Sequence, residues 1–205
     1  MVNIYTFLTA FFSLLVVVAN LLTAKWVWIP FYPEGIPAGL LLYPLTFLIN
    51  DFVVEIYGKK MAKQMVYTGF ILALITWGTF YLISVWPEGK QASTLTFSHL
   101  FFGASVASSI AAYLFGQLTD IKAYDWISRK SGYLWLRSGG STLISQLLDT
   151  VIVNGLLFLV FVPHPPQEVF QLMVASYLYK AVVAVMMVPI FYMMVYGVRY
   201  GLRTA

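Results

Sequence analysis

The sequence predicts an all-α membrane protein, folded as one domain over residues 1–205 and built as a bundle of six transmembrane helices. One observation behind this fold class is that the chain is 60% hydrophobic. Another is that only 10% of its residues are charged, against about 25% in a soluble globular domain. The last is that Lys and Arg cluster in alternate connections between apolar stretches, which is typical of membrane topology.

Six apolar stretches are long enough to cross a bilayer, which takes about 20 residues. They cover residues 5–24, 36–57, 65–85, 97–120, 142–162 and 170–196. The first is longer than the apolar core of a signal peptide and has no Lys or Arg before it, so we expect it to be retained. Gly35, Pro37, Gly39 and Pro44 crowd the start of the second, and both a proline-kinked helix and a re-entrant or broken entry fit them.

The basic residues predict the orientation. Nine of the 12 Lys and Arg residues follow the second and fourth stretches or lie at the C-terminus, whereas Lys25 and Lys90 fall on the opposite side. The positive-inside rule then places both termini in the cytoplasm. Because the basic residues form no tail or RNA-binding motif, we expect no nucleic-acid partner.

The sequence also excludes several kinds of chemistry. It contains no GxSxG or HExxH motif and no GxxxxGK[ST] phosphate-binding loop, so we expect neither a hydrolase nor a nucleotide-driven motor. Cysteine is absent, and His99 and His164 lie near the outer edge without matched ligands. We therefore expect no enzyme activity, no metal site and no cofactor.

Polar side chains line one face of the fifth stretch, and a lysine is placed deep in the sixth. The spacing of the polar residues is i, i+3, i+4, i+7, i+8 and i+12, which is one helical face: Thr142, Ser145, Gln146, Asp149, Thr150 and Asn154. Lys180 is too deep to reach water easily. We expect Asp149 and Lys180 to pair, either only to hold the helices together or also to contact a ligand.

A second polar group lies in the inner half of the second stretch, around Asn50 and Asp51. Asp51 and Glu55 are four residues apart and share a helical face. Two carboxylates this close resist simultaneous ionisation, so one can hold a proton and serve in cation recognition or proton coupling. The alternative is that Glu55 pairs with Lys59 one turn further on.

The fourth stretch ends with polar residues at the same level. Gln117 and Asp120 can join the second polar group, or Asp120 can cap the basic connection that begins at Lys122. The same stretch has small residues at four-residue spacing, which predicts close packing against a neighbouring helix: Ala104, Ser108, Ala112 and Gly116.

Four motifs together resemble the YhhQ-type queuosine precursor transporters, also called the vitamin uptake transporter family. They are YPLTFLIND at residues 43–51, EIYGKK at 55–60, AYLFGQLTD at 112–120 and SQLLDT at 145–150. Lys180 falls where the family has a lysine in its last helix. The resemblance covers nearly the whole chain with the motifs in the right order.

The resemblance implies a bacterial inner-membrane importer of a 7-deazaguanine: 7-cyano-7-deazaguanine, 7-aminomethyl-7-deazaguanine or queuine. A guanine-like edge offers N–H donors and one carbonyl acceptor, which suits carboxylate and amide partners, and an aromatic ring can stack on the base. We expect the following residues to bind substrate: Asn50, Asp51, Gln117, Gln146, Asp149, Lys180 and Tyr43. We expect an accessory or coupling role for Glu55, Asp120 and Thr150.

Two other functions fit the same residues. The chain can be the substrate-binding subunit of an energy-coupling-factor importer, which would need partner helices and ATPases. It can also be a membrane assembly protein in which the buried charges only pair. The sequence leaves open which 7-deazaguanine is preferred, whether an ion is coupled and whether the protein is a homodimer.

Overall fold

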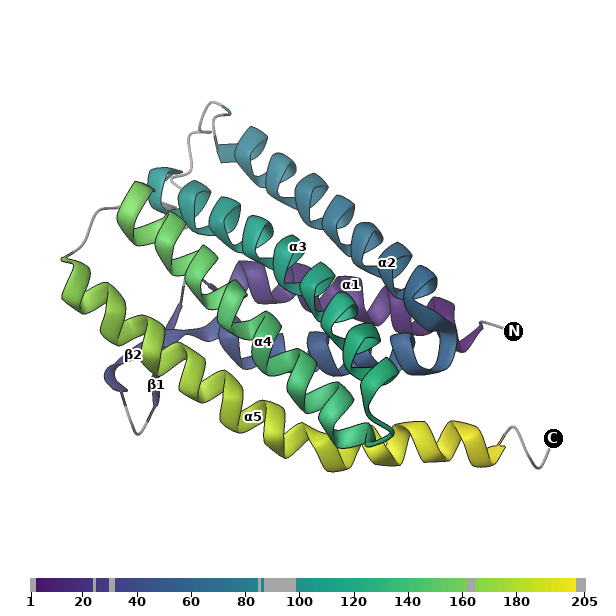
Figure 1. Ribbon diagram of the computed structural model, residues 1–205. Helices are drawn as coiled ribbons and strands as arrows, with labels where there is room; N and C mark the ends of the chain where they lie inside the picture. Colours follow the sequence, from purple (N-terminus) through teal and green to yellow (C-terminus); the bar gives the residue numbers. More distant parts are fainter. Residues whose placement is uncertain are drawn as a thin grey trace.

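The computed structural model describes residues 3–23, 25–29, 32–84, 86, 99–161 and 165–201, and these form a helical bundle (Figure 1). The long helices are α1 (Ile4–Leu22), α2 (Tyr43–Ser84), α3 (His99–Lys130), α4 (Leu134–Asn154) and α5 (Pro166–Gly201). A hairpin of strands β1 (Trp26–Ile29) and β2 (Tyr32–Pro37) and a 3₁₀ turn (Ala38–Leu41) connect α1 to α2. A π-helical segment (Gly155–Phe161) extends α4.

The helical fold class predicted from the sequence is confirmed at this level. Within the described ranges, four stretches are long and apolar enough to cross a membrane, namely Ile4–Leu22, Ala38–Ile83, Leu134–Phe158 and Pro166–Tyr200. The ends of the predicted stretches at residues 24, 85, 97 and 162 lie outside the described residues, as does His164.

The start of the second predicted stretch is wrong, because residues 36–42 are not α-helical. Strand β2 pairs antiparallel with β1, with Val27 opposite Ile36, and the 3₁₀ turn follows before α2 begins at Tyr43. Proline lacks the N–H group that a helix needs, and glycine loses more conformational entropy than other residues when it is fixed in a helix. The segment that contains Gly35, Pro37 and Gly39 therefore favours extended backbone. The broken entry is therefore the interpretation that holds, and the uninterrupted helix is not.

Helix α2 covers both the second and the third predicted stretches, with a break between them. Gly58 has φ +81° and ψ +164°, which interrupts the helix without a separate loop. The basic loop expected after residue 57 is therefore replaced by helix, interrupted at Gly58. The hydrophobic pattern located the two halves, but only the backbone of Gly58 shows how abruptly the chain turns.

The connection between the fourth and fifth predicted stretches is also shorter than expected. Helix α3 continues to Lys130 and α4 already begins at Leu134, so only residues 131–133 join them. The end of α3 and the start of α4 contain polar and basic residues and lie outside the apolar stretches. Hydropathy therefore could not show that these residues are helical.

The interior core lies where α1, α2 and α3 pack together, around buried side chains such as Phe12, Val53 and Met65. On the outside, large apolar side chains such as Ile75 of α2 and Met186 of α5 are exposed. An apolar exterior around a packed interior is what a lipid-facing bundle requires.

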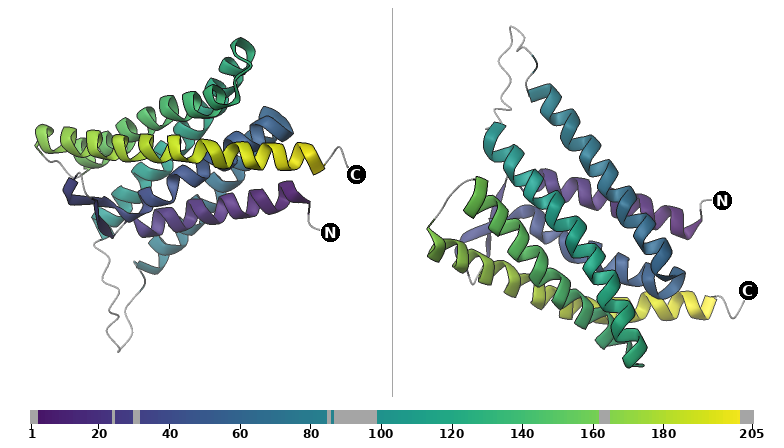
Figure 2. Two further views of the ribbon diagram at one scale, coloured as in Figure 1. Left: turned by 90° about the horizontal axis from the view of Figure 1, so that it is seen from below. Right: turned by 45° about the horizontal axis from the view of Figure 1, so that its top comes forward.

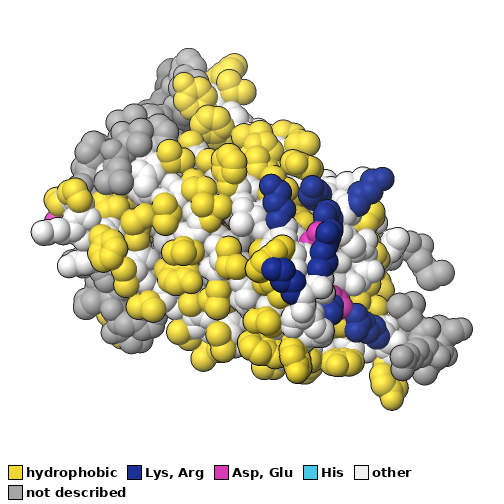
Figure 3. Space-filling view, in the orientation of Figure 1, with side chains coloured by type: hydrophobic (Ala, Val, Ile, Leu, Met, Phe, Trp, Pro, Cys, Tyr) yellow, Lys and Arg dark blue, Asp and Glu magenta, His cyan; other side chains and the backbone are white. Residues whose placement is uncertain are grey.

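The two ends of the bundle differ in charge. Figure 3 shows Lys and Arg gathered at one end of this face, with apolar side chains covering the rest. Both chain ends lie at that basic end, and the hairpin lies at the other, in the views of Figure 1 and Figure 2. We call these the basic end and the hairpin end.

The backbone at Gly58 predicts a cost for any side chain there. Its conformation is one that only glycine adopts readily, so Gly58→Ala should destabilise the protein by about 1–3 kcal/mol, although no atom lies within 4 Å of the added Cβ. The matched control is Gly78→Ala in the same helix, also with free space, which should be neutral or stabilise by about 1 kcal/mol. Thermal unfolding midpoints in detergent measure both, and equal midpoints would contradict the break at Gly58.

Candidate functional site

A buried ion pair joins α4 to α5. The Nζ atom of Lys180 lies 2.6 Å from Oδ2 of Asp149 and also donates to the hydroxyl of Thr150 at 3.1 Å. The side chains of Lys180 and Asp149 are 0% and 2% exposed. The ammonium group lies 5.7 Å from the centre of the Tyr43 ring of α2. The pairing predicted from the sequence is confirmed.

Helix α3 approaches the pair through Gly116. A Cβ atom at this position would lie 3.2 Å from Cβ of Asp149, so the absence of a side chain lets α3 pack directly on the carboxylate. Ser108 and Ala112, on the same small-residue face, are fully buried. The face predicted to pack closely therefore does so, and it brings α3 against the ion pair.

Several buried polar atoms beside the pair have no hydrogen-bond partner. These are Oδ1 of Asp149, both amide atoms of Gln146 and Oε1 of Gln117. Gln146 precedes Asp149 by one turn of α4, and Gln117 follows Gly116 on α3, so the three side chains belong to one region that we call the polar layer. A buried polar group without a partner costs about 1–3 kcal/mol, so this layer is suited to a ligand with several donors and acceptors.

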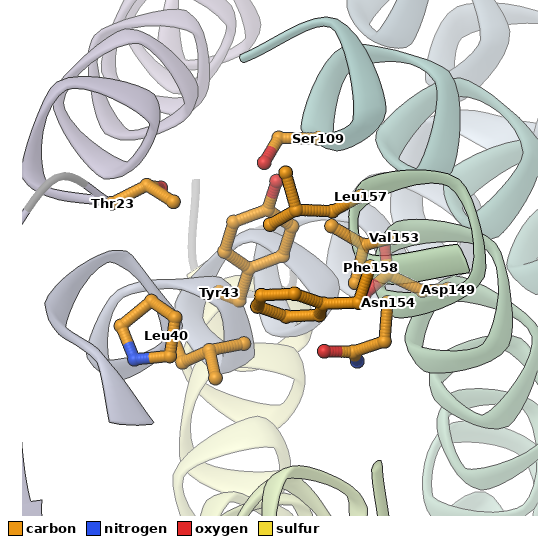
Figure 4. A pocket seen from close by; sticks show the side chains of 10 residues that line it. Thr23, Leu40, Tyr43, Ser109, Asp149, Val153, Asn154, Leu157 and Phe158 are labelled. Carbon is orange, nitrogen blue, oxygen red and sulfur yellow. The ribbon is translucent and has the colours of Figure 1, made fainter. Parts of the chain in front are cut away.

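A pocket reaches the polar layer from the hairpin end. The empty space in it, counted with the open solvent at its mouth, is about 470 Å³, and its lining is mostly apolar with a few polar groups. The lining residues are Thr23, Pro37, Leu40, Tyr43, Ser109, Asp149, Val153, Asn154, Leu157 and Phe158. In Figure 4 the Tyr43 ring lies in the middle of the pocket with its hydroxyl directed toward Ser109, a contact that is also a hydrogen bond.

Asp51 and Asp120 form a second polar group, which we call the carboxylate pair. Both side chains are 0% exposed, and hydrogen bonds through Ser141 and Ser145 link the two carboxyl groups. Asp51 also accepts from Ser138 at 2.5 Å and from Thr142 at 3.2 Å. Asp51 therefore binds hydroxyl groups of α4, whereas Glu55, one turn further along α2, binds arginines at the basic end. That Asp51 and Glu55 resist simultaneous ionisation stays a prediction.

Asp120 is anchored from two sides. It accepts from Asn50 at 2.9 Å and from Ser145 at 3.0 Å. The alternative that Asp120 caps the connection beginning at Lys122 is therefore wrong. Gln117, one turn earlier on α3, donates to Thr46 at 3.0 Å. Its backbone carbonyl lies 3.5 Å from Nδ2 of Asn50, which also binds Asp120, so Asn50 links the carboxylate pair to the polar layer.

Glu55 belongs to an ion network at the basic end. Its carboxylate, 7% exposed, pairs with Arg199 of α5 and, at 3.3 Å, with Arg137 of α4, and it accepts from the Tyr124 hydroxyl of α3 at 2.8 Å. The alternative pairing of Glu55 with Lys59 is wrong, because Lys59 binds Asp125 at 2.9 Å. Its partners come from other helices, so spacing along α2 could not identify them.

The sequence did not identify Ser138, Ser141 or Ser109 as site residues. Ser138 and Ser141 precede Thr142 and Ser145 by four residues, so the same helical period extended toward the N-terminus would have found them. They were missed because the fifth stretch was taken to begin at Thr142. Ser109 carries no such signal, since it is one of two adjacent serines on an otherwise small and apolar helix.

A helical bundle with an apolar exterior, a buried ion pair and a polar layer open to a pocket defines a membrane transport protein. Residues 37–194 match the family described as "Putative vitamin uptake transporter". The match spans most of the chain and includes the four motifs quoted above. The chain belongs to this family.

Curated relatives agree with the family. A protein of Bacillus subtilis (strain 168) named "Probable queuosine precursor transporter" is 31% identical over 160 residues, 75% of this chain and 69% of the relative. The "Queuosine precursor transporter" of Escherichia coli (strain K12) is 25% identical over 166 residues, 78% of this chain and 71% of the relative. No solved structure matches the chain at a significant level.

The ion pair predicts opposite results for single and double substitutions. Lys180→Met leaves Asp149 buried without its cation and should destabilise the protein by about 3–5 kcal/mol. The double variant Lys180→Met/Asp149→Leu removes both charges and should recover most of that loss. Thermal midpoints of the detergent-purified variants measure this coupling, and additive losses in the double variant would show that the two side chains do not interact.

Proposed function

We propose that this protein imports queuosine precursors, taken up as free 7-deazaguanine bases, across the bacterial inner membrane. The observation that carries the proposal is the polar layer, in which buried atoms of Gln146, Gln117 and Asp149 have no hydrogen-bond partner and Asp149 lines a pocket. The names of the curated relatives supply the substrate class. The relatives are named as transporters, so we assign this chain no enzyme activity.

The polar layer matches the hydrogen-bonding edge of a guanine-type base. Such an edge presents N–H donors beside one carbonyl acceptor. Oδ1 of Asp149 and Oε1 of Gln117 accept from the donors, and the amide N–H of Gln146 donates to the carbonyl. Lys180 Nζ donates to Asp149 and to Thr150, and these two contacts hold the Asp149 carboxylate in place. The Tyr43 ring stacks on the base, an interaction worth about 1–3 kcal/mol.

Asn50 and Asp51 take a supporting part in this proposal. Their nearest partners are protein groups, Asp120 for Asn50 and Ser138 for Asp51, which supports placing them behind the polar layer rather than against the base. They then position Gln117, whose backbone carbonyl lies 3.5 Å from Nδ2 of Asn50.

For the membrane arrangement we propose six spans with both termini in the cytoplasm. The two halves of α2 on either side of Gly58 count as separate spans, which gives an even number together with α1, α3, α4 and α5. The concentration of Lys and Arg at the end that holds both termini supports this orientation by the positive-inside rule. The pocket then opens from the periplasmic side.

Loss of the Asp149 carboxylate should abolish uptake. Asp149→Asn removes the charge that holds Lys180 and weakens acceptance from the base, so we expect at least a tenfold loss of uptake per amount of protein in the membrane. The assay is a bacterium that can neither make nor import the precursors, fed each of the three candidate bases, with queuosine in tRNA as readout.

The matched control for that substitution is Glu168→Gln, an exposed carboxylate in the first turn of α5, which should leave uptake unchanged. Normal uptake by Asp149→Asn would reject the assignment of Asp149. If cells that carry the wild-type protein make no queuosine in tRNA when fed any of the three bases, the substrate class is rejected. Uptake by the purified chain alone in liposomes would exclude a requirement for energy-coupling partners.

The orientation can be tested by cysteine labelling, because the chain has no cysteine of its own. Trp28→Cys in the hairpin, where the native side chain is 70% exposed, should react with an impermeant maleimide in intact spheroplasts. Lys130→Cys at the end of α3 should react only after the membrane is opened. The reverse pattern would place the basic end outside.

A further inference from the structure

We infer that the carboxylate pair, Asp51 and Asp120, is the proton-binding site that couples transport of the base to a proton gradient. The inference rests on the proposed function, since it assigns the energy source for the same transport. Three observations support the inference: the two carboxyl groups are buried, hydroxyl groups surround them, and Oδ1 of the neighbouring Asn50 has no hydrogen-bond partner.

The carboxylate pair has no cation to balance it. Both side chains are 0% exposed, and among the described residues the buried cation is Lys180, which is already paired with Asp149. Two unbalanced negative charges inside a membrane-embedded bundle are costly. The two carboxyl groups are linked through Ser141 and Ser145. Two carboxylates this close resist simultaneous ionisation, so one of them can hold a proton.

The hydroxyl groups around the pair can serve both protonation states. Ser141 lies within hydrogen-bond distance of Asp51 Oδ1, at 3.3 Å, and of the backbone carbonyl of Ser138, at 3.0 Å. Ser145 likewise lies 3.0 Å from Asp120 Oδ1 and 3.0 Å from the backbone carbonyl of Ser141. Each hydroxyl has one proton to donate. It can therefore donate to the carboxylate when that is ionised and to the helix carbonyl when the carboxyl is protonated.

The unpartnered acceptor is Oδ1 of Asn50. Asn50 is 0% exposed, and its amide is fixed against Asp120 by the 2.9 Å bond from Nδ2, while its Oδ1 has no hydrogen-bond partner. The other side-chain partners of the pair among the described residues are the hydroxyl groups of Ser138, Ser141, Thr142 and Ser145. A protonated carboxyl gains an O–H donor, and the Asn50 carbonyl, on the amide that already binds Asp120, is an acceptor without a partner.

The position of the pair explains how a proton and a base can influence each other. Ser145, which contacts Asp120, is adjacent in sequence to Gln146 of the polar layer, and Gln117 precedes Asp120 by one turn. A change of hydrogen bonding at the pair is therefore next to the groups proposed to hold the base. The O–H bond forms when a proton arrives and breaks when the proton leaves toward the basic end.

The charged and titratable neighbours of the pair come from each helix packed around it. They are Glu55 one turn further along α2, Tyr124 one turn further along α3, and Arg137 beside Ser138 on α4. Arg199 of α5 faces Glu55 rather than the pair. Arg137 and Arg199 both bind Glu55, and among the described residues neither forms an ion pair with Asp51 or Asp120.

The test uses the full-length protein in liposomes with labelled 7-cyano-7-deazaguanine. With the outside one pH unit more acidic, movement of one proton per base should concentrate the base inside by about tenfold, since each pH unit is a tenfold concentration ratio. A proton ionophore should abolish this accumulation. A sodium gradient at equal pH should produce none.

Asp120→Asn keeps an acceptor for Ser145 but cannot take up a proton, so its response to the pH gradient should fall from about tenfold to about onefold. The matched control is Asp125→Asn on the same helix. Asp125 is bound by Lys59 and Arg129, and the hydrogen bond from Lys59 lowers the pKa of this exposed carboxyl. The control should keep the full response.

A wild-type measurement decides the matter if Asp120→Asn does not fold. Adding base outside liposomes that contain a pH-sensitive dye should acidify the interior in proportion to the base taken up. Entry of base without acidification, or accumulation driven by sodium, would overturn the proton site. Failure of the proposed function looks different, because the wild type would then neither accumulate nor exchange labelled base under any gradient.

Discussion

The buried ion pair between Asp149 and Lys180 is the interaction on which the rest of the interior depends. Neither charge could be tolerated alone in a bundle surrounded by lipid, so each residue requires the other. The pair fixes α4 against α5, and Gly116 lets α3 reach the same carboxylate. Because Lys180 occupies Oδ2, the other carboxylate oxygen of Asp149 remains available at the edge of the pocket.

Three polar groups follow one another along the bundle, and each has a different electrostatic character. The ion pair and polar layer are neutral overall and have unpaired hydrogen-bonding groups. The carboxylate pair beyond them is anionic and surrounded by donors. The Glu55 network at the basic end combines one carboxylate with two guanidinium groups. A solute moving along this axis would therefore pass the polar layer first, then the carboxylate pair, and finally the Glu55 network.

The sequence was sufficient for features that depend on a single helix. Hydropathy located the helical stretches, and the helical period placed Gln146 and Asp149 on one face. It failed where a contact joins distant parts of the chain. The spacing of Asp51 and Glu55 suggested a pair, but Asp51 contacts Asp120 and Glu55 contacts Arg199, 144 positions away. It also did not predict the hairpin, most of which fell in an expected connection; only Ile36 and Pro37 of β2 had been placed in the second stretch.

Glu55 has a mechanical consequence for the bundle. One carboxylate holds Tyr124 of α3, Arg137 of α4 and Arg199 of α5 to α2 at the basic end. These helices cannot separate there one at a time without breaking contacts that share the same two oxygen atoms. Motion at this end therefore involves several helices together, and the side chain that joins them lies three residues before the break at Gly58.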